Sequence, residues 1–256
     1  MTLTTNWPTR RSSRIVALAL VVLVSLAVAA CADRGEPVGD RAASDSQNAT
    51  TTGDAGPNAE ISRLTTRQWR EMKAAGMLRP ECPIVRRNQL RAVSINHFDF
   101  NGDVRRGEVV VNSDVAKSMV RILTKLYDAK FPIRRMSPVE TYGGDTNKSL
   151  RADNTSAYNC RRADQINAPF SESPHANGRA IDINPQENPW KDLRCRCWFP
   201  SAKERVRNDE PGKIYKGGLV WRTFRAEGWI WQDIDVADYM HFDTGYPSKP
   251  FLPRVP

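Results

Sequence analysis

Two short segments that lie far apart in the chain carry most of its potential metal ligands, so the fold is constrained to bring them together. The first contains His175 and Asp182, and the second contains Asp238 and His241. Two of the three histidines of the chain fall in these segments. A catalytic zinc ion takes three nitrogen or oxygen ligands and leaves a fourth position for water, while a nearby carboxylate acts as the base. The sequence therefore predicts a zinc site with Asp238 as its base.

Both segments have the alternation of β-strands. In residues 180–183 and 240–243, apolar side chains occupy every second position, which directs them into the core. The same alternation directs Asp182 and His241 to the opposite face of each strand. Gly178 permits a tight turn between the first histidine and its strand. We therefore expect the ligands to project from rigid strands toward a common point.

The pattern S-x-H-x-x-G-x-A-x-D, followed by D-x-x-H, resembles the M15 family of zinc D,D-peptidases. That family includes vancomycin-resistance carboxypeptidases and dipeptidases and phage L-alanyl-D-glutamate endolysins. The resemblance runs over about residues 82–242 and is closest to an actinobacterial branch. It implies one zinc ion per chain, held by His175, Asp182 and His241, with Asp238 as the general base.

Other carboxylates lie near the last ligand. Asp233, Asp235 and Asp243 are rivals of Asp238 for the role of base. The offset of three residues before His241 favours Asp238 through the resemblance, and we expect this residue in the turn that enters the last strand. His97 has no partner at a metal-binding spacing, and we interpret it as structural.

Further site residues follow from the resemblance and from side-chain chemistry. An Arg on the segment before the first histidine is expected to stabilise developing negative charge, and Arg161 or its neighbour Arg162 matches that position. The alternative for either is an ordinary solvated arginine. Ser173, Tyr158 and Trp231 are candidates to line the substrate pocket, although aromatic side chains are more often part of the core.

The N-terminal sequence indicates export. Residues 1–30 carry three arginines and then an apolar run that ends in small residues, which is the pattern of a signal peptide. The sequence up to Cys31 resembles a bacterial lipobox, in which this cysteine becomes the lipidated first residue. Ordinary cleavage nearby and an uncleaved anchor are the alternatives. Residues 31–60 are polar and rich in Gly, Ser and Thr, which predicts a flexible linker.

The remaining residues, 61–256, are sufficient for one domain, with its core at about 82–245. Helical periodicity and strand-like alternation mix without a regular βαβ repeat, which predicts an α+β fold. We expect an antiparallel sheet that carries the zinc site and is flanked by helices, as in M15 and hedgehog-like domains. The expected helices are 66–75, a segment capped by Ser113, and 219–227. The expected strands are 90–98, 107–112, 132–136 and 229–231, besides the two that carry ligands.

Four cysteines remain after Cys31, and they allow three disulfide pairings in an oxidising compartment. The resemblance favours a disulfide between Cys82 and Cys160, because both positions match family positions that are often cysteine. The pairing of Cys195 and Cys197 stays open. A second zinc site at these two is disfavoured, since no further ligand completes it.

The formal net charge of +9 falls to +6 once residues 1–30 are removed. An exported basic protein is suited to adhere to anionic wall polymers or lipid headgroups, although the charge also fits a merely soluble surface. The export signal and the absence of a nucleic-acid-binding motif disfavour a nucleic-acid partner, and no obligate protein partner is evident. The expected location is the cell envelope, with a lipid anchor in the outer face of the cytoplasmic membrane.

Together these features predict an exported zinc metallopeptidase that acts on peptidoglycan stem peptides, of the D-Ala-D-Ala carboxypeptidase type. An L-Ala-D-Glu endopeptidase would use the same zinc ligands and differ in its pocket loops. A non-catalytic zinc-containing domain that recognises the cell wall, and a purely structural lipoprotein, are the alternatives from other classes. The presence of Asp238 favours the enzymes.

Overall fold

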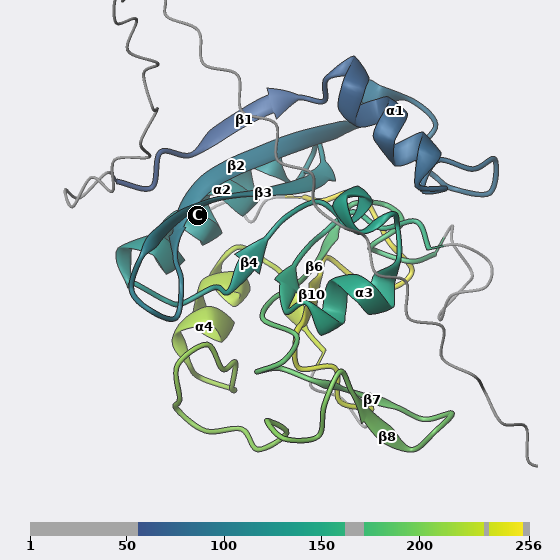
Figure 1. Ribbon diagram of the computed structural model, residues 1–256. Helices are drawn as coiled ribbons and strands as arrows, with labels where there is room; N and C mark the ends of the chain where they lie inside the picture. The colour runs from purple at the N-terminus through teal and green to yellow at the C-terminus, as the bar shows by residue number, and fades with distance from the viewer. Residues whose placement is uncertain (1–55, 162–171, 233–235, 253–256) are drawn as a thin grey trace, which may run out of the picture. The chain divides into compact units, whose positions relative to one another are not determined.

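The computed structural model describes residues 56–161, 172–232 and 236–252 (Figure 1). The predicted signal peptide, Cys31, most of the predicted linker, Arg162, Asp233 and Asp235 lie outside these ranges. The helices are α1 (Thr66–Ala74), α2 (Ala116–Asp128), α3 (Thr146–Arg151) and α4 (Leu219–Ala226), with 3-10 turns η1 (Arg87–Gln89) and η2 (Val139–Tyr142). Within the described ranges, no helix has the length and apolar character needed to cross a membrane.

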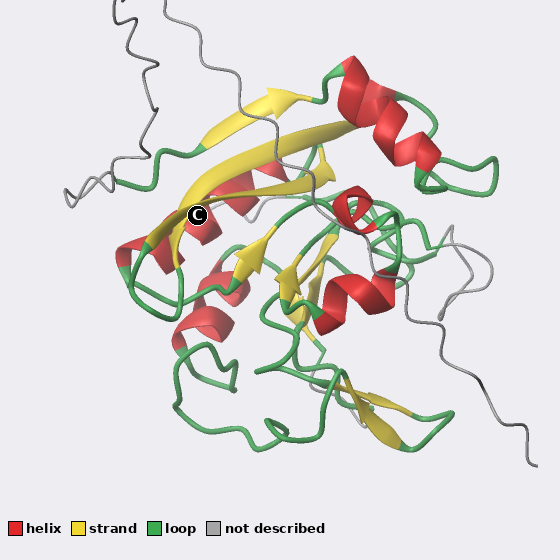
Figure 2. Ribbon diagram, viewed as in Figure 1, coloured by secondary structure: helices red, strands yellow, loops and turns green. Residues whose placement is uncertain are grey.

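The largest sheet is antiparallel, with strand order β1-β2-β3 (Figure 2). It consists of β1 (Glu60–Arg63), β2 (Leu90–Phe98) and β3 (Val104–Asn112). β2 and β3 form a long hairpin in which Val93 faces Val109, and the turn is stabilised by Asp99, whose carboxylate accepts two backbone N–H groups. Val93 and Val109 belong to the core cluster that includes the apolar face of α2. Alternation along the two strands therefore creates one face that packs on this helix.

The opposite face of this sheet has its own core. Ala92 and Val110 of β2 and β3 pack with Met72 of α1 and with the disulfide between Cys82 and Cys160. Helix α1 is stabilised at its start by a capping box in which Thr65 and Gln68 exchange hydrogen bonds. The disulfide joins this N-terminal layer to the segment that leads toward the site.

A second antiparallel sheet, of order β6-β10-β9, carries the residues of interest. Its strands are β6 (Ala180–Asp182), β10 (His241–Asp243) and β9 (Ile230–Trp231). An antiparallel bridge between Ser156 and Asp182 extends this sheet toward the segment that includes β5. Ile181 and Phe242 pair across β6 and β10 and are fully buried, so the sheet rests on the same core as α2 and α4.

Two smaller strand pairs complete the described fold. β4 (Arg135–Met136) and β5 (Asn154–Thr155) pair in parallel, whereas β7 (Trp190–Asp192) and β8 (Cys197–Phe199) form an antiparallel hairpin. A disulfide between Cys195 and Cys197 closes the tip of this hairpin. The mixed helix and antiparallel-sheet architecture is compatible with an M15-like fold, and among the described strands only β4 and β5 pair in parallel, beside an isolated parallel bridge between Phe98 and Pro132.

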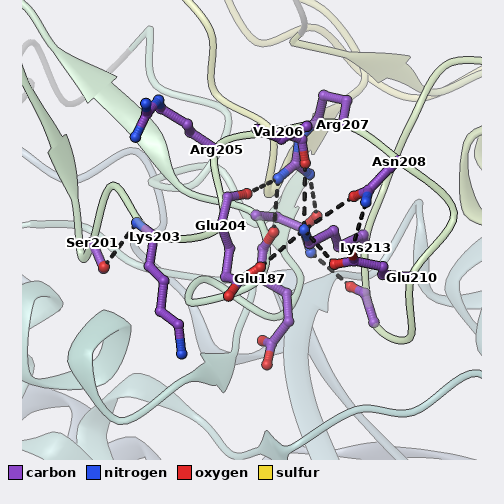
Figure 3. A network of polar contacts seen from close by, with 12 residues as sticks. Glu187, Ser201, Lys203, Glu204, Arg205, Val206, Arg207, Asn208, Glu210 and Lys213 are labelled. Atoms are coloured by element: carbon purple, nitrogen blue, oxygen red, sulfur yellow. Dashed lines mark hydrogen bonds and ion pairs between the residues drawn. The ribbon is translucent and has the colours of Figure 1, made fainter.

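The segment after the hairpin has little regular structure and is held by a polar network instead (Figure 3). The ammonium of Lys213, which is buried, pairs with Glu204 at 2.9 Å and with Glu210 at 2.6 Å. Arg207 donates to Asn188 Oδ1 at 2.8 Å and to the carbonyl of Glu187 at 2.9 Å. These bonds satisfy buried polar groups that have no helix or sheet partners.

Most predicted elements are confirmed, with several differences. The predicted strand 132–136 is limited to Arg135–Met136, and α3 and β5 were not predicted. The helix of residues 116–128 is not capped by Ser113, because the chain turns through residues 113–115 and Val115 occupies the N-cap without a side-chain bond. The predicted strand 107–112 begins earlier, at Val104, since pairing with β2 continues to the hairpin turn. The β7–β8 hairpin was not predicted, and β1 begins at Glu60, the last residue of the predicted linker.

Candidate metal centre

The second sheet brings the three predicted ligands together. Asp182 of β6 and His241 of β10 are direct cross-strand partners, so their side chains leave the sheet on the same face. His175 precedes β6 in a turn that returns through Gly178. This glycine has φ +69° and approaches β3 so closely that a Cβ would lie 2.6 Å from the backbone N of Asn112. Its carbonyl accepts a hydrogen bond from that N–H at 2.7 Å, which fixes the turn.

The ligand atoms have the spacing of a tetrahedral metal site. His175 Nε2 lies 2.9 Å from His241 Nδ1 and 3.2 Å from Asp182 Oδ1, and the last two atoms are 3.1 Å apart. Two ligands bound to tetrahedral zinc at about 2.0–2.1 Å lie about 3.3 Å from each other. The three residues are 4–9 % exposed. Small rotations of buried groups would therefore accommodate a zinc ion.

Hydrogen bonds outside the triad fix the tautomers of both histidines. His175 Nδ1 lies 2.7 Å from the carbonyl of Ala157, to which only a protonated Nδ1 can donate. His241 Nε2 lies 3.1 Å from Asp243 Oδ2 and donates to that carboxylate. The remaining nitrogen of each ring therefore presents a lone pair toward Asp182. Three acceptor atoms without a donor among them attract a cation, either a proton or a metal ion, and two imidazole nitrogens with one carboxylate oxygen are ligands that zinc takes.

Electrostatics agree with this interpretation. Burial raises the pKa of Asp182, but the two histidines outweigh that effect and hold this pKa below its usual range. Burial lowers the pKa of His241, whereas hydrogen bonds to Asp182 and Asp243 raise it to about 10. The site thus favours positive charge strongly, and a divalent cation satisfies the same groups that otherwise bind a proton.

Asp238 lies beside the triad without belonging to it. It forms a bridge with Trp190 and opens the tight turn that leads to β10, since the N–H of His241 donates to its carbonyl at 3.2 Å. Its Oδ1 is buried and has no hydrogen-bond partner within the described structure. Burial raises the pKa of Asp238 to about 7, against the lowering effect of His241. A carboxylate with this pKa is matched to accept a proton near neutral pH.

The two histidines of the triad, His175 and His241, line a pocket of about 560 Å³ together with Asp238. This volume suits a small ligand or a few residues of a peptide. Arg161 and Ser173 also line the pocket, and the charge of Arg161 acts on Asp238, whose pKa it lowers. The structure thus brings both residues to the place that the sequence analysis gave them.

Two predicted pocket residues lie elsewhere. Tyr158 is 2 % exposed in the core under the first sheet, where its hydroxyl donates to the carbonyl of Met77 at 2.7 Å. Trp231 is buried in the other core, and its indole N–H donates to the carbonyl of Tyr239 at 2.9 Å. Both residues form their side-chain hydrogen bonds inside the fold, and neither lines the pocket. The prediction that Tyr158 and Trp231 contact the substrate is therefore corrected. His97 is buried in the fold, as its structural interpretation expects.

Several residues of the pocket had no assignment from the sequence. The sequence analysis considered Asp243 only as a rival of Asp238 for the role of base. In the structure Asp243 accepts a hydrogen bond from His241 Nε2, and Gln232 donates to the same Oδ2 atom at 2.9 Å. Lys191 and Arg194 of the β7–β8 hairpin also line the pocket. The alternation of β10 could have identified Asp243 as a neighbour of His241, whereas no local signal identified the hairpin.

An open site with two histidines, one carboxylate ligand and an adjacent carboxylate is the arrangement of hydrolytic zinc enzymes. Residues 167–244 match a family model described as D-alanyl-D-alanine carboxypeptidase, of the M15 peptidases. The matched segment contains the complete triad and Asp238, and it supports a peptidase of the M15 family. Searches of curated proteins and of solved structures found no match.

Proposed function

We propose that this protein is an exported zinc peptidase that hydrolyses stem peptides of peptidoglycan, of the D-Ala-D-Ala carboxypeptidase type. One observation supports it most: His175 and His241 form with Asp182 a cluster that could hold a metal ion, and both line the same pocket as Asp238, whose buried Oδ1 has no partner in the described structure. The family match over this segment supports the substrate class. A recognition domain would have no need of a base beside its metal.

His175, Asp182 and His241 would hold the zinc ion, which when bound lowers the pKa of a water molecule and polarises a carbonyl group. Asp238 accepts the proton of the attacking water and returns it to the leaving amine, a role suited to its raised pKa. Arg161 contributes positive charge that stabilises the developing oxyanion. Asp243, through its bond to His241, keeps that ring in the tautomer that binds metal.

The proposal extends to the location of the protein. The signal-peptide pattern and the lipobox-like sequence at Cys31 support export and attachment to the outer face of the cytoplasmic membrane. A polar linker after this cysteine would let the catalytic domain reach the surrounding wall.

The test is replacement of the base in zinc-loaded protein. Asp238→Asn preserves the shape of the side chain and removes its basicity, so we expect unchanged zinc content and a loss of about 10²–10⁴ in turnover. Asp243→Asn serves as the comparison, because it alters the neighbouring carboxylate instead. Mass spectrometry of stem peptides identifies the product: loss of one D-alanine indicates the carboxypeptidase, and cleavage between L-Ala and D-Glu indicates the endopeptidase. Near-normal turnover by Asp238→Asn contradicts the assigned base, and zinc-loaded wild-type protein without activity on any stem peptide favours a recognition domain.

A further inference from the structure

Three basic side chains line the pocket of the candidate metal centre, and they differ in how their charges are balanced. The charge of Arg161 acts on Asp238. Arg194 pairs with Asp192, with its Nε 2.9 Å from Oδ1. Lys191 is half-buried, yet its ammonium has no hydrogen bond or ion pair with any residue that the structure describes. Among residues 56–161, 172–232 and 236–252, Lys191 is therefore a basic residue of the pocket lining whose ammonium has no partner.

The position of Lys191 is tied to that of the proposed base. Its backbone N–H donates to the carbonyl of Ala237 at 2.8 Å, and its neighbour Trp190 forms the antiparallel bridge with Asp238. β7 thus runs beside the strand-like segment that carries Asp238. Lys191 and Asp238 thus line one pocket from adjacent, hydrogen-bonded segments.

Packing behind the hairpin maintains this arrangement. Trp198, which pairs with Lys191 in β8, stacks on Tyr239 with ring centroids 5.4 Å apart. The guanidinium of Arg207 lies 4.3 Å from the centroid of the Tyr239 ring, and Arg207 belongs to the polar network of Figure 3. The Cys195–Cys197 disulfide constrains the tip of the hairpin. These contacts hold the β7–β8 hairpin, and with it the backbone of Lys191, in place beside the pocket.

An ammonium group at a pocket attracts a ligand that carries a negative charge, and a charge-assisted hydrogen bond to a carboxylate is stronger than one between neutral groups. We infer that Lys191 binds the terminal carboxylate of the substrate, and that the β7–β8 hairpin selects peptides with a free carboxylate beside the scissile bond. This inference rests on the proposed function, because it names the feature that the pocket recognises in its peptide. The lysine side chain is flexible and its ammonium group acts as a point charge, so the group can adjust its position to the bound carboxylate.

The experiment compares a stem peptide that ends in D-Ala-D-Ala with the same peptide as its C-terminal amide, both with zinc-loaded protein. We expect wild-type protein to prefer the acid through KM. Lys191→Met keeps the aliphatic stem and removes the charge, so it should raise KM for the acid about 10- to 100-fold, change kcat little, and abolish the preference over the amide. Lys191→Arg should recover much of the preference. Lys117→Met, which removes an exposed lysine of α2, should behave as wild type.

Binding provides a readout that does not depend on turnover. Calorimetric titration of zinc-loaded Asp238→Asn protein with both peptides should show tighter binding of the acid, and adding Lys191→Met should remove the difference. Equal binding of acid and amide, or an unchanged preference in Lys191→Met, overturns the role of Lys191 while leaving the peptidase proposal intact. Absence of cleavage of either peptide by wild-type protein rejects the proposed function, and the binding preference then still decides the role of Lys191.

Discussion

Asp182 Oδ1 lies 3.1 Å from His241 Nδ1, across two directly paired strands of the second sheet. The two ligands are thus fixed relative to each other by backbone pairing, and only His175 depends on a turn. The two histidine rings are each held by a buried partner outside the triad, His175 by the carbonyl of Ala157 and His241 by the carboxylate of Asp243. This rigidity is what lets three acceptor atoms remain close together in a folded protein despite their mutual repulsion.

Asp243→Ala should weaken zinc binding without removing a ligand. Asp243 accepts from His241 Nε2 at 3.1 Å and thereby holds the ring in the tautomer whose Nδ1 presents a lone pair toward Asp182. Loss of such a partner typically lowers metal affinity about 10- to 100-fold. Competition with a chromophoric chelator measures this change, and Gln232→Ala, which removes only a bond to Asp243, should have a smaller effect. An affinity equal to that of wild type would show that Asp243 does not orient His241.

The Cys82–Cys160 disulfide should contribute substantially to stability. It joins residues 78 positions apart in the sequence. In the chain-entropy model a loop of this length stabilises the fold by about 4 kcal/mol, before any strain is subtracted. We expect the Cys82→Ser, Cys160→Ser double variant to lose about this amount in urea unfolding. The Cys195→Ser, Cys197→Ser variant is the control, because that disulfide closes a very short loop and should change the free energy of unfolding much less. Equal losses in the two variants would contradict this account.

Glu140 should make the stability of the domain depend on pH. It lies in η2 with one carboxylate oxygen buried and without a hydrogen-bond partner in the described structure, near Glu71 and Glu108. Burial raises its pKa from 4.5 to about 7. The folded state therefore binds a proton that the unfolded state releases, and the free energy of unfolding decreases as the pH rises from about 4.5 through 7.

Glu140→Gln stays neutral at every pH, so its stabilising effect relative to wild type should grow by up to about 2 kcal/mol between pH 5 and pH 8. Urea unfolding at the two pH values measures this difference. Glu60→Gln, at an exposed position of β1, should give a difference within about 0.5 kcal/mol. The same gain for Glu140→Gln at both pH values would show that Glu140 is ionised in the folded protein throughout this range.

The sequence predicted the metal-binding strands because a period of two residues separates buried from exposed side chains within a single segment. The alternation of residues 180–183 and 240–243 suffices to place Asp182 and His241 on one face, and β6 and β10 confirm both strands. Helix α2 was predicted for the same reason, since its apolar residues recur with helical period.

The remaining differences arise from long-range contacts. Nothing in the local sequence distinguishes Tyr158, which a contact with Met77 holds in the core, from an aromatic residue of the pocket. The β7–β8 hairpin has no alternation, and its position follows from the backbone bond between Lys191 and Ala237 and from the stacking of Trp198 on Tyr239. Such contacts join segments that only the complete fold brings together.

Zinc content tests the central claim most directly. Purified protein, dialysed against zinc and then freed of excess metal, should contain about one zinc ion per chain by elemental analysis, and His175→Ala, Asp182→Ala and His241→Ala should each lose it. Lys117→Met should retain the metal as a control. Stoichiometric zinc in wild-type protein together with its loss in all three ligand variants is the predicted result. Full zinc content in His175→Ala, or absence of zinc from the wild type, would contradict the metal centre described above.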